Sequence, residues 1–471
     1  MKKYFTIISA LLITLFLNSC GKKFLTENPY SSVAAADAIQ SVNDMTSAVN
    51  GMYAGMRTAN LYGRTLPIIG DLMADNIYIS ASNSGRYLSQ WQYSVTVSDG
   101  FVDGTWADAY TVILRANNVI NAVIDSSSSQ VSELKGEAYA ARALMYFELI
   151  RQFAKPYTVD STSDGVPLIL KYDPNIKPAR AKVNEVYAQI LSDLYNSINM
   201  INEDDKSSAY INKYGAEAIL ARVYQFMNNW QAAQTYALDI VNNGRYTLTT
   251  SDQLQSYWAS FTPRTDRVET IFEIEYDRID YLFTDALDAF YSQDGYGDAL
   301  CTNGLYQSYT VTDARQSLII AGTRAGDSVW IVNKYPNTSN PDGTDNTKVI
   351  RYAEVLLILA EAYHFNGDDP DALITLNLVA QQRDPSFAGY TDTGDLLETD
   401  ILNERRKELA FEGFRYWDFI RLNLDITREN NSHEYPGQTP LLIPATDTRR
   451  QMPIPQIETD ANPNVSQNPG Y

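Results

Sequence analysis

Five charged residues near the C-terminus have the types and the spacing that acid–base chemistry would need. They are Glu404, Arg405, Glu408, Glu412 and Arg415. On a helix, residues three or four apart occupy neighbouring turns, and two carboxylates one turn apart could approach the separation that glycosidases use. The apolar residues between them would bury such a helix, however, and a buried charge is retained when it is paired. We therefore predict that these charges pair with Arg351, Glu354 or Glu361 and that the chain is not an enzyme.

The chain has few residues that could support a reactive thiol or a zinc site. The chain has two cysteines, Cys20 and Cys301, and two histidines, His364 and His433. A nucleophilic thiol needs a nearby base, and a structural zinc site needs about four cysteine or histidine ligands. We therefore predict no cofactor and no metal ligands, and we expect Cys301 to be a small buried apolar residue.

Three acidic groups could suggest oxygen ligands for calcium. They are Asp75-Asn76, Asp368-Asp369, and Asp342 with Asp345. None has the full spacing of a calcium-binding loop. Solvated turns and helix caps explain these residues better, although the sequence leaves a structural calcium ion open.

The N-terminus has the anatomy of an export signal. Lys2 and Lys3 precede an almost unbroken apolar run from Tyr4 to Leu17, and small or polar residues follow. As a helix this run would reach only about 21 Å, short of the roughly 30 Å hydrocarbon core of a membrane. We therefore predict that residues 1–19 are a signal peptide, which is removed from the mature chain.

The end of this signal predicts a lipid anchor. Leu17-Asn18-Ser19-Cys20 resembles the bacterial lipobox, in which the thiol receives a diacylglyceryl group and the new amino terminus is acylated. Cys20 would then carry several acyl chains, such as palmitate, and two chains suffice for stable anchoring. A cysteine at this place otherwise has no structural role. The alternative is a soluble secreted protein with a chance cysteine after its signal peptide.

The composition fits a large exported protein and argues against nucleic acid as a partner. Removal of the signal peptide leaves 471 − 19 = 452 residues, enough for a core that needs neither metal nor disulfide. The net charge of −20 becomes −22 without Lys2 and Lys3, and such a field repels nucleic acid and anionic lipid. The 33 tyrosines combine a flat apolar face with a hydroxyl, which suits ligands such as sugars or peptides.

Apolar residues at helical spacing predict four pairs of helices. The pairs are Ser41–Arg57 with Trp106–Ile124, Ser132–Phe153 with Asn184–Ile201, Tyr214–Met227 with Trp230–Asn242, and Val349–Phe365 with Asp369–Gln382. Closely spaced alanines in the third pair would let its helices approach, as in tetratricopeptide repeats. In the fourth pair, Gly367 reads as the stop of one helix, with Asp369 as N-cap and Pro370 as the first helical residue of the next.

Two longer segments separate these helices. Residues 156–178 are rich in turn residues and predict a loop with short strands, and residues 246–348 predict an aromatic-rich irregular insertion. Because the insertion interrupts the pairs, we do not expect a continuous helical array. We divide the chain into the signal peptide 1–19, an N-terminal region 20–245 with three helix pairs, and a C-terminal region 246–471 with the insertion and the fourth pair.

Three stretches together resemble one family. They are residues 349–362 (VIRYAEVLLILAEA), residues 403–418 (NERRKELAFEGFRYWD) and the ending 453–471, with PIPQ, NPN and QNPGY. Phe24-Leu25, the stretch from Trp106 to Asn117, and Asp313-Ala314-Arg315 are also similar. In this order, and along essentially the whole mature chain, the motifs resemble the SusD/RagB family of Bacteroidetes.

The resemblance implies an outer-membrane, surface-exposed lipoprotein of mainly α fold. Its scaffold would have four tetratricopeptide-like helix pairs, long irregular insertions and a few short strands. Such a protein caps a SusC-like, TonB-dependent transporter and delivers glycans or, in RagB-like members, oligopeptides, without catalysis. A protein-interaction scaffold is a further alternative. Gly21-Lys22-Lys23 lacks the acidic cluster that often accompanies surface export, so lipidation has firmer support than surface exposure.

Aromatic and polar residues in the irregular segments are the candidate ligand contacts. One group lies between the first two helices and, by its position, resembles the family region that supplies an aromatic platform with an arginine. The other lies in residues 276–309, within the insertion. Aromatic faces would stack on the apolar side of a sugar ring while polar groups bind its hydroxyls. The predicted ligand-binding residues are Asn83, Arg86, Trp91, Tyr281, Phe290, Tyr291 and Tyr296.

Overall fold

The computed structural model describes most of the chain after the predicted signal peptide. The described residues are 38–124, 128–202, 206–277, 279–340, 343–431, 434–435 and 439–471. The predicted signal peptide, the predicted lipidation site Cys20, and His433 lie outside them. None of the helices in these ranges has the length and the apolar character needed to cross a membrane.

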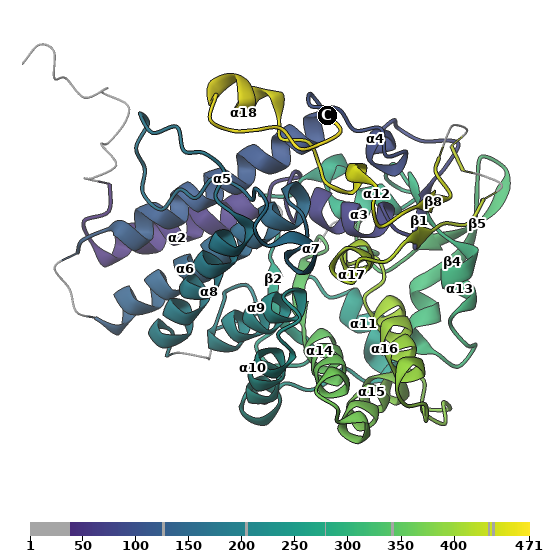
Figure 1. Ribbon diagram of the computed structural model, residues 1–471. Coiled ribbons are helices and arrows are strands. Elements are labelled where there is room, and N and C mark those ends of the chain that lie inside the picture. Colours follow the sequence, from purple (N-terminus) through teal and green to yellow (C-terminus); the bar gives the residue numbers. More distant parts are fainter. Residues whose placement is uncertain are drawn as a thin grey trace, which may run out of the picture.

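In the described part of the chain, nine long helices form the main body, and their arrangement can be followed in Figure 1. They are α2 (Val42–Met56), α5 (Gly100–Asn121), α6 (Ser129–Phe153), α8 (Val183–Met200), α9 (Lys213–Phe226), α10 (Trp230–Asn243), α14 (Tyr352–Phe365), α15 (Asp369–Arg383) and α16 (Asp395–Glu408). Each helix in this order packs against the next, so they form one array. The four predicted pairs are confirmed as α2 with α5, α6 with α8, α9 with α10, and α14 with α15.

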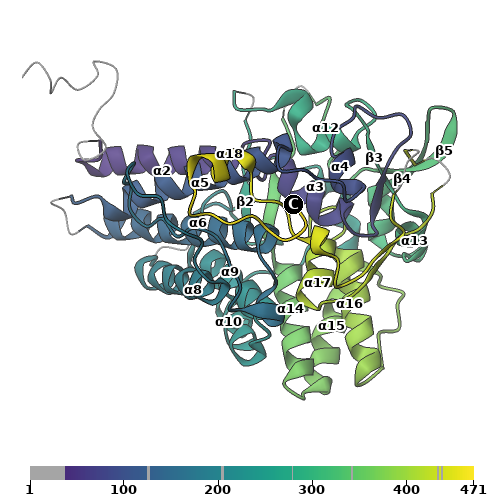
Figure 2. The ribbon, with the colours of Figure 1, turned by 45° about the horizontal axis from the view of Figure 1, so that its top comes forward.

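The expectation of a discontinuous array is wrong. α10 packs directly against α14, although about a hundred residues separate them in the sequence. Figure 2 shows the array passing from α10 to α14 while the insertion folds to one side. The inserted segment leaves the array and returns to it, so the interruption exists in the sequence and not in space.

Local capping explains where several helices begin. Ser41 caps α2 in a capping box with Asp44, so the helix begins at Val42. α5 begins at Gly100 and not near Trp106, because Asp99 caps it through the backbone N–H groups of Phe101 and Val102. Sequence reading missed this first stretch because Gly100 and Gly104 weaken the helical signal.

The fourth pair also differs from the prediction at its boundaries. The residues Thr347–Arg351 form strand β6, and the helix α14 begins only at Tyr352. The β-branched Val349 and Ile350 suit a strand, and pairing with a distant partner strand decides the outcome. Gly367 has the expected left-handed backbone, but the N-cap of α15 is Asp368 and not Asp369.

Shorter helices connect the array to the rest of the fold. The α-helices are α3 (Thr65–Leu72), α4 (Leu88–Trp91), α7 (Tyr157–Asp160), α11 (Leu254–Trp258), α12 (Leu287–Tyr291), α13 (Asn303–Gln307), α17 (Arg415–Arg421) and α18 (Gln456–Ala461). The 3-10 helices are η3 (Ser251–Gln253), η4 (Phe283–Asp285), η5 (Ala314–Leu318) and η6 (Thr448–Arg450). Residues 161–178 form no strand and contribute only an isolated bridge between Asp164 and Lys182, contrary to the expected short strands.

A four-stranded antiparallel sheet lies beside the array, at the right of Figure 1. Its strands are β1 (Ile77–Ile79), β3 (Ala299–Cys301), β5 (Asp327–Val332) and β4 (Ile319–Arg324), in this spatial order. β4 and β5 form a hairpin whose two turn residues, Ala325 and Gly326, both have positive φ, as a type I′ turn requires. Ala325 replaces the usual asparagine or aspartate, so the sequence carried no clear hairpin signal.

The described residues also form two sheets of two strands each. β2 (Thr270–Ile274) pairs with β6, and β7 (Ile426–Thr427) pairs with β8 (Leu442–Ile443). Every residue of β2 is buried, so it lacks the alternation that reveals a half-exposed strand. The insertion predicted as irregular therefore contains defined strands and short helices.

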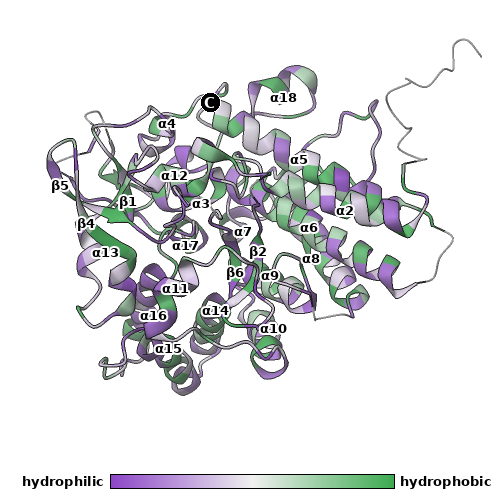
Figure 3. Ribbon diagram, turned by 180° about the vertical axis from the view of Figure 1, so that it is seen from behind, coloured by the Kyte–Doolittle hydropathy of each residue, from purple (hydrophilic) through white to green (hydrophobic). Residues whose placement is uncertain are grey.

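One hydrophobic core joins all these parts. Its buried apolar side chains extend from Ile39 to Val465. In Figure 3 the long helices alternate apolar and hydrophilic segments, as helices with one buried face do. The C-terminal segment returns across the first helices, where the side-chain amide of Asn468 donates to the carbonyl of Phe153 and the backbone of Gln456 donates to that of Val97.

Candidate ligand-binding site

Three loops meet at one end of the four-stranded sheet and form a polar pocket. Residues 82–84 follow β1, residues 293–298 precede β3, and residues 323–325 close the hairpin between β4 and β5. The antiparallel pairing of β1 with β3 brings the first two loops together. The third loop joins them through Arg324, which donates to the backbone carbonyls of Ser82 and Tyr296. The cavity volume of about 520 Å³ lies within the roughly 300–1,000 Å³ range of small-molecule sites. We call it the sheet-end pocket.

Three of the predicted ligand residues come together here. Asn83 and Tyr296 line the sheet-end pocket, and Arg86 contacts the tyrosine. The guanidinium carbon of Arg86 lies 3.8 Å from the centre of the Tyr296 ring, and its Nη2 donates a hydrogen bond of 3.0 Å to the tyrosine hydroxyl. This cation–π contact orients Tyr296, the one aromatic side chain among the described residues that line the pocket.

The backbone around Arg86 is fixed by an unusual turn. Gly85 and Tyr87, on either side of it, both have left-handed backbones, which cost a non-glycine residue free energy. Tyr87 is buried, and its hydroxyl accepts a hydrogen bond of 2.8 Å from Arg64. The carboxylate of Asp285 binds both Arg64 and Arg86, and the hydrogen bond from Arg64 is the main reason that its pKa is lowered. Arg86 therefore lies in a turn whose conformation is stabilised by the contacts of Tyr87 and Asp285.

Arg324 ties the three loops of the sheet-end pocket together. It donates to the backbone carbonyls of Ser82 and Tyr296 at 2.7 and 2.6 Å. Beside it, the buried carboxylate of Asp298 accepts hydrogen bonds from the backbone and the hydroxyl of Ser84. Burial raises the pKa of Asp298. These contacts make the polar lining rigid before any ligand arrives.

Gln293 supplies the lining with an unused hydrogen-bond donor. Its Oε1 accepts a hydrogen bond of 3.1 Å from Arg324, whereas its buried Nε2 has no partner in the described part of the chain. A buried donor without a partner costs free energy, which a ligand oxygen would recover. The pocket thus offers amides, a guanidinium, a carboxylate and one ring face, a set that suits a polar ligand rich in hydroxyl groups.

A second aromatic feature lies on the sheet near this pocket and was missed by the sequence reading. Trp330 of β5 pairs with Ala321, two positions along the strands from the pocket residue Thr323, or about 7 Å. Its ring stacks on Tyr306 with centroids 3.5 Å apart, and its Nε1 donates to Asn303 at 2.9 Å. Both rings are partly exposed. The run of β-branched residues around Trp330 is the sequence signal that could have revealed it.

The other predicted aromatic contacts do not line the sheet-end pocket. Trp91, Phe290 and Tyr291 are only 2%, 1% and 0% exposed, so none offers a ring face to a ligand in this structure. Phe290 packs edge-on against Tyr87, and Trp91 lies in the same core. Tyr281 is half-buried and its hydroxyl donates to Asp288. Sequence reasoning placed these aromatics in loop-rich segments, where it cannot separate rings that support a site from rings that form it.

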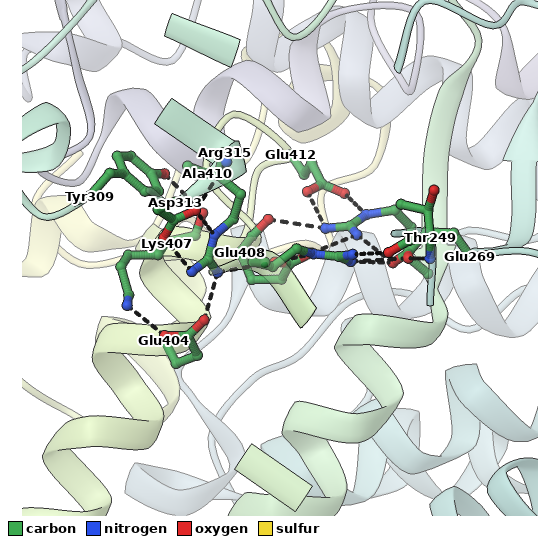
Figure 4. Close-up of polar contacts among 12 residues, drawn as sticks. Thr249, Glu269, Tyr309, Asp313, Arg315, Glu404, Lys407, Glu408, Ala410 and Glu412 are labelled. Carbon is green, nitrogen blue, oxygen red and sulfur yellow. Dashed lines mark hydrogen bonds and ion pairs between the residues drawn. The ribbon is translucent and has the colours of Figure 1, made fainter. Parts of the chain in front are cut away.

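The charged residues near the C-terminus form a buried network (Figure 4). The carboxylate of Glu408 accepts hydrogen bonds from Arg351 at 2.9 Å, from Arg383 at 3.0 Å and from Arg315 at 3.1 Å. Arg351 and Arg383 also bind Glu269. Burial alone would raise the pKa of Glu408, but the three guanidinium groups outweigh it and hold this pKa well below its ordinary value.

The predicted pairing within this network is confirmed for Glu408 and Glu412, which both bind Arg351. The remaining charges pair elsewhere: Glu404 with Arg315 and Lys407, Arg405 with Asp418, Arg415 with Asp75, Glu354 with Arg222, and Glu361 with Arg421. The residues also do not share one helix, because α16 ends at Glu408 and α17 begins at Arg415. Carboxylates that are buried and saturated with guanidinium groups are unsuited to proton transfer.

The remaining reactive groups have structural partners. Cys301 is buried as predicted, and burial raises the pKa of its thiol. The Nδ1 of His364 lies 2.7 Å from the carboxylate of Asp369. Among the residues described above, no three histidine, cysteine, aspartate or glutamate side chains are grouped so that they could hold a metal ion.

The acidic groups that were considered for calcium also have other roles. Asp368 caps α15, and Asp75 forms an ion pair with Arg415. Asp345 accepts two hydrogen bonds from Asn337, one from its backbone and one from its side-chain amide. The interpretation as a helix cap is confirmed for Asp368, whereas Asp75 is not a solvated turn residue. Asp342 lies outside the described residues.

Two family models match the chain. The model described as "Starch-binding associating with outer membrane" matches residues 23–225, and the model of the SusD family matches residues 306–471. The matched stretches include the sequence motifs that suggested the family.

Curated relatives align along nearly the whole chain. A SusD-like protein of Formosa agariphila, P2, is 27% identical, and the alignment covers 100% of both chains. A SusD-like protein of Bacteroides ovatus is 24% identical over 86% of this chain and 80% of its own.

Solved structures have the same fold. A putative sugar-binding protein of Bacteroides vulgatus superposes with a TM-score of 0.84 at 29% identity, covering 92% of this chain and 99% of its own. A SusD superfamily protein of Bacteroides thetaiotaomicron gives a TM-score of 0.83 at 29% identity, covering 92% and 100%. These structures confirm the predicted mainly α fold. The chain belongs to the SusD/RagB family, whose members are nutrient-binding proteins associated with the outer membrane.

Proposed function

We propose that the protein captures a glycan in the sheet-end pocket and delivers it to a SusC-like, TonB-dependent transporter. The observation that carries this proposal is the pocket itself. Three loops far apart in the sequence meet there, with the Tyr296 ring held by Arg86 and a free amide donor on Gln293. A rigid ring face beside unsatisfied polar groups suits a sugar ring, which is apolar on its faces and polar at its edge.

The relatives favour a glycan over a peptide as the ligand. One matching family model is described as starch-binding, and one structure with 29% identity is described as a sugar-binding protein. The charges around the pocket also balance, since Arg86 and Arg324 face Asp285 and Asp298. A neutral glycan needs no further counter-charge.

Isothermal titration against two panels tests the ligand class. The first panel contains neutral oligosaccharides, namely maltoheptaose, laminarihexaose and xylohexaose, and the second contains mixed oligopeptides of six to ten residues. We expect heat of binding with at least one glycan and none with the peptides. Clear binding of peptides with no binding of any glycan would reject the glycan and favour an oligopeptide-binding role.

The lipid anchor and the transporter form the second half of the proposal. The lipobox at Cys20 supports anchoring, and the family supports a position at the outer membrane. Mass spectrometry of the protein from outer-membrane fractions should find Cys20 as the first residue with acyl chains attached. A chain that starts elsewhere, or an unmodified Cys20, would contradict the anchor.

Co-purification tests the transporter. The chain extracted from the outer membrane in mild detergent should bring a TonB-dependent barrel protein with it in a constant ratio. Protease treatment of intact cells should degrade the protein if it is exposed on the surface. Isolation of the chain alone, with uptake of the glycan unchanged in a deletion strain, would contradict delivery.

We infer no catalytic role. The carboxylates that could have acted as a glycosidase pair are buried and bound to arginines. We expect the glycans that bind to be recovered intact by chromatography after long incubation. Turnover that disappears in Glu408→Gln would overturn this inference.

A further inference from the structure

A second pocket lies between the first helix and the strand β2, apart from the sheet-end pocket. Its walls come from α2, from the segment before α9 and from the chain after β2. Buried Tyr53, Ala209 and Ile274 contribute apolar surface to it. The cavity volume of about 420 Å³ is that of a small-molecule site. It shares no lining residue with the sheet-end pocket. We call it the helix-side pocket.

The glycine at position 51 keeps this pocket open. Gly51 lies in the interior of α2 and lines the pocket. A glycine at such a position destabilises the helix, so its presence calls for an explanation. Packing is not the reason, because a Cβ added at Gly51 would meet no atom within 4 Å. At Gly55, one turn further on, an added Cβ would lie only 2.9 Å from Val112. Gly55 is therefore required by packing, whereas Gly51 leaves empty space in a pocket wall.

One wall of the helix-side pocket is a supported aromatic ring. Tyr210 is 37% exposed and packs edge-on against Tyr53, with ring centroids 5.7 Å apart. Tyr53 is held in turn, because its hydroxyl donates to Glu137 at 2.7 Å and accepts from the backbone of Ile211 at 3.0 Å. The Tyr210 ring thus presents apolar surface to the pocket and is supported by Tyr53, which two hydrogen bonds hold in place.

Two polar side chains of the pocket make no hydrogen bond or ion pair with any described residue. Arg57 and Asp280 pair with each other. The carboxylate of Glu275, by contrast, takes part in no hydrogen bond or ion pair with any described residue, and the exposed amide of Asn50 also makes none. Partial burial raises the pKa of Glu275. A ligand that donates hydrogen bonds would satisfy this carboxylate.

We propose that the helix-side pocket is a second binding site, which takes a single neutral saccharide unit. The tyrosine ring would pack on the face of the sugar, while Asn50, Arg57 and Glu275 would bind its hydroxyls. Once Arg57 and Asp280 neutralise each other, Glu275 leaves one negative charge, so anionic sugars are disfavoured. The class of ligand rests on the proposed function, but the position of the site does not. A second site would let the protein hold two points of one glycan or two glycans.

Titration of the full mature chain with short glycans tests the second site. The probes are the trisaccharides maltotriose, laminaritriose and xylotriose. Gly51→Leu places a side chain in the empty space of the wall and also replaces a poor helix former. The matched control is Asn43→Leu, an exposed position on the same helix that does not line the pocket.

The expected result is a stoichiometry of two for a probe that binds the wild type. Gly51→Leu and Tyr210→Ala should each reduce it to one, Tyr296→Ala should also reduce it to one, and Asn43→Leu should leave it at two. Trigalacturonate should bind the helix-side pocket at least tenfold more weakly than the neutral probe.

Two results separate the failure of this proposal from the failure of the proposed function. A stoichiometry of one that Tyr296→Ala abolishes and Gly51→Leu leaves unchanged would overturn the second site alone. Binding that Gly51→Leu abolishes and Tyr296→Ala leaves unchanged would support the helix-side pocket and overturn the sheet-end pocket. The absence of binding by every neutral glycan would overturn both.

Discussion

At the scale of single residues, Gln293 is the pocket side chain with a hydrogen-bond donor that is free to bind a ligand. Its amide nitrogen is buried in the wall of the sheet-end pocket without a partner, while its oxygen is held by Arg324. Replacement by methionine keeps the length of the side chain and removes both the free donor and the oxygen that accepts from Arg324. We expect Gln293→Met to weaken glycan binding by about 0.5–1.5 kcal/mol, or roughly two- to tenfold in Kd.

Calorimetry should compare the Kd for the glycan of the wild type, of Gln293→Met and of the control variant Asp294→Asn. Asp294 is the exposed neighbour of Gln293 and does not line the pocket. Its substitution should leave the Kd unchanged. Equal Kd values for wild type and Gln293→Met would show that the amide does not meet the ligand.

Trp91 can be tested as either a ligand contact or a residue of the hydrophobic core. It is 2% exposed, and its backbone carbonyl accepts a hydrogen bond from Arg428. Truncation of a buried tryptophan typically costs about 3–5 kcal/mol of folding free energy. We therefore expect Trp91→Ala to lower the free energy of unfolding by this amount, measured by urea denaturation, with Trp91→Phe less affected. Full stability combined with lost glycan binding would instead make Trp91 a platform.

The family resemblance and the residue types together predicted part of the pocket. Asn83 and Arg86 were chosen because their segment resembles the family region that supplies an aromatic platform with an arginine. Tyr296 was chosen because it is an aromatic residue in a loop-rich segment, where ligands often bind. Gln293 and Arg324 were missed, since nothing in their immediate neighbours distinguishes them from surface residues. The burial of Phe290 and Tyr291 follows from how α12 packs, which is a tertiary fact that the local sequence does not carry.

At the scale of elements, the start of α15 offers a sharp test of capping. The side chain of Asp368 accepts a hydrogen bond from the backbone N–H of Asp371. Loss of such a cap typically costs about 0.5–2 kcal/mol, whereas asparagine caps as well as aspartate does. We expect Asp368→Ala to lower the free energy of unfolding by about 1 kcal/mol and Asp368→Asn to leave it nearly unchanged. A loss in Asp368→Asn equal to that in Asp368→Ala would show that the charge, not the cap, matters.

The buried network joins α15, α16, the strand β6 and Glu269, which lies directly before β2, and it predicts a loss of stability in acid. The pKa of Glu408 is held below its unfolded value near 4.5, so the folded state releases this proton more readily than the unfolded state. The stabilisation is then complete above about pH 4.5 and is lost as the pH falls toward the folded pKa. The free energy of unfolding should therefore fall steeply below about pH 4.5.

Glu408→Gln tests this network. Removing one partner of a buried ion pair typically costs about 3–5 kcal/mol, and the guanidinium groups of Arg351, Arg383 and Arg315 would each lose one of the carboxylates that balance their charge. We expect this loss at pH 7 and a shallower dependence on pH below 4.5, both measured by urea denaturation. A variant that keeps the acid slope of the wild type would show that other carboxylates cause it.

The elements that were predicted correctly are those whose own sequence decides them. The eight helices of the four pairs carry apolar periodicity over three turns or more, so their existence followed from the sequence. The strands were missed because partners far along the chain decide them. β6 became a strand because β2 pairs with it, and the hairpin of β4 and β5 uses Ala325 in a turn that usually has asparagine or aspartate.

At the scale of the whole molecule, the fold brings the insertion back onto a continuous helical array. α10 contacts α14 across the insertion, and a single core includes residues from both ends of the chain. The sheet-end pocket is therefore built on a fixed base rather than on an isolated loop. The family was predictable from the order of its motifs, whereas the pocket depends on three loops that only the folded chain brings together.

The central claim is that the sheet-end pocket binds the nutrient. Its most direct test is the Kd of wild type and Tyr296→Ala for maltoheptaose, laminarihexaose and xylohexaose, with the exposed Tyr172→Ala as a control. We predict that Tyr296→Ala weakens binding of the recognised glycan at least tenfold, while Tyr172→Ala changes nothing. Equal Kd values for wild type and Tyr296→Ala would contradict the account.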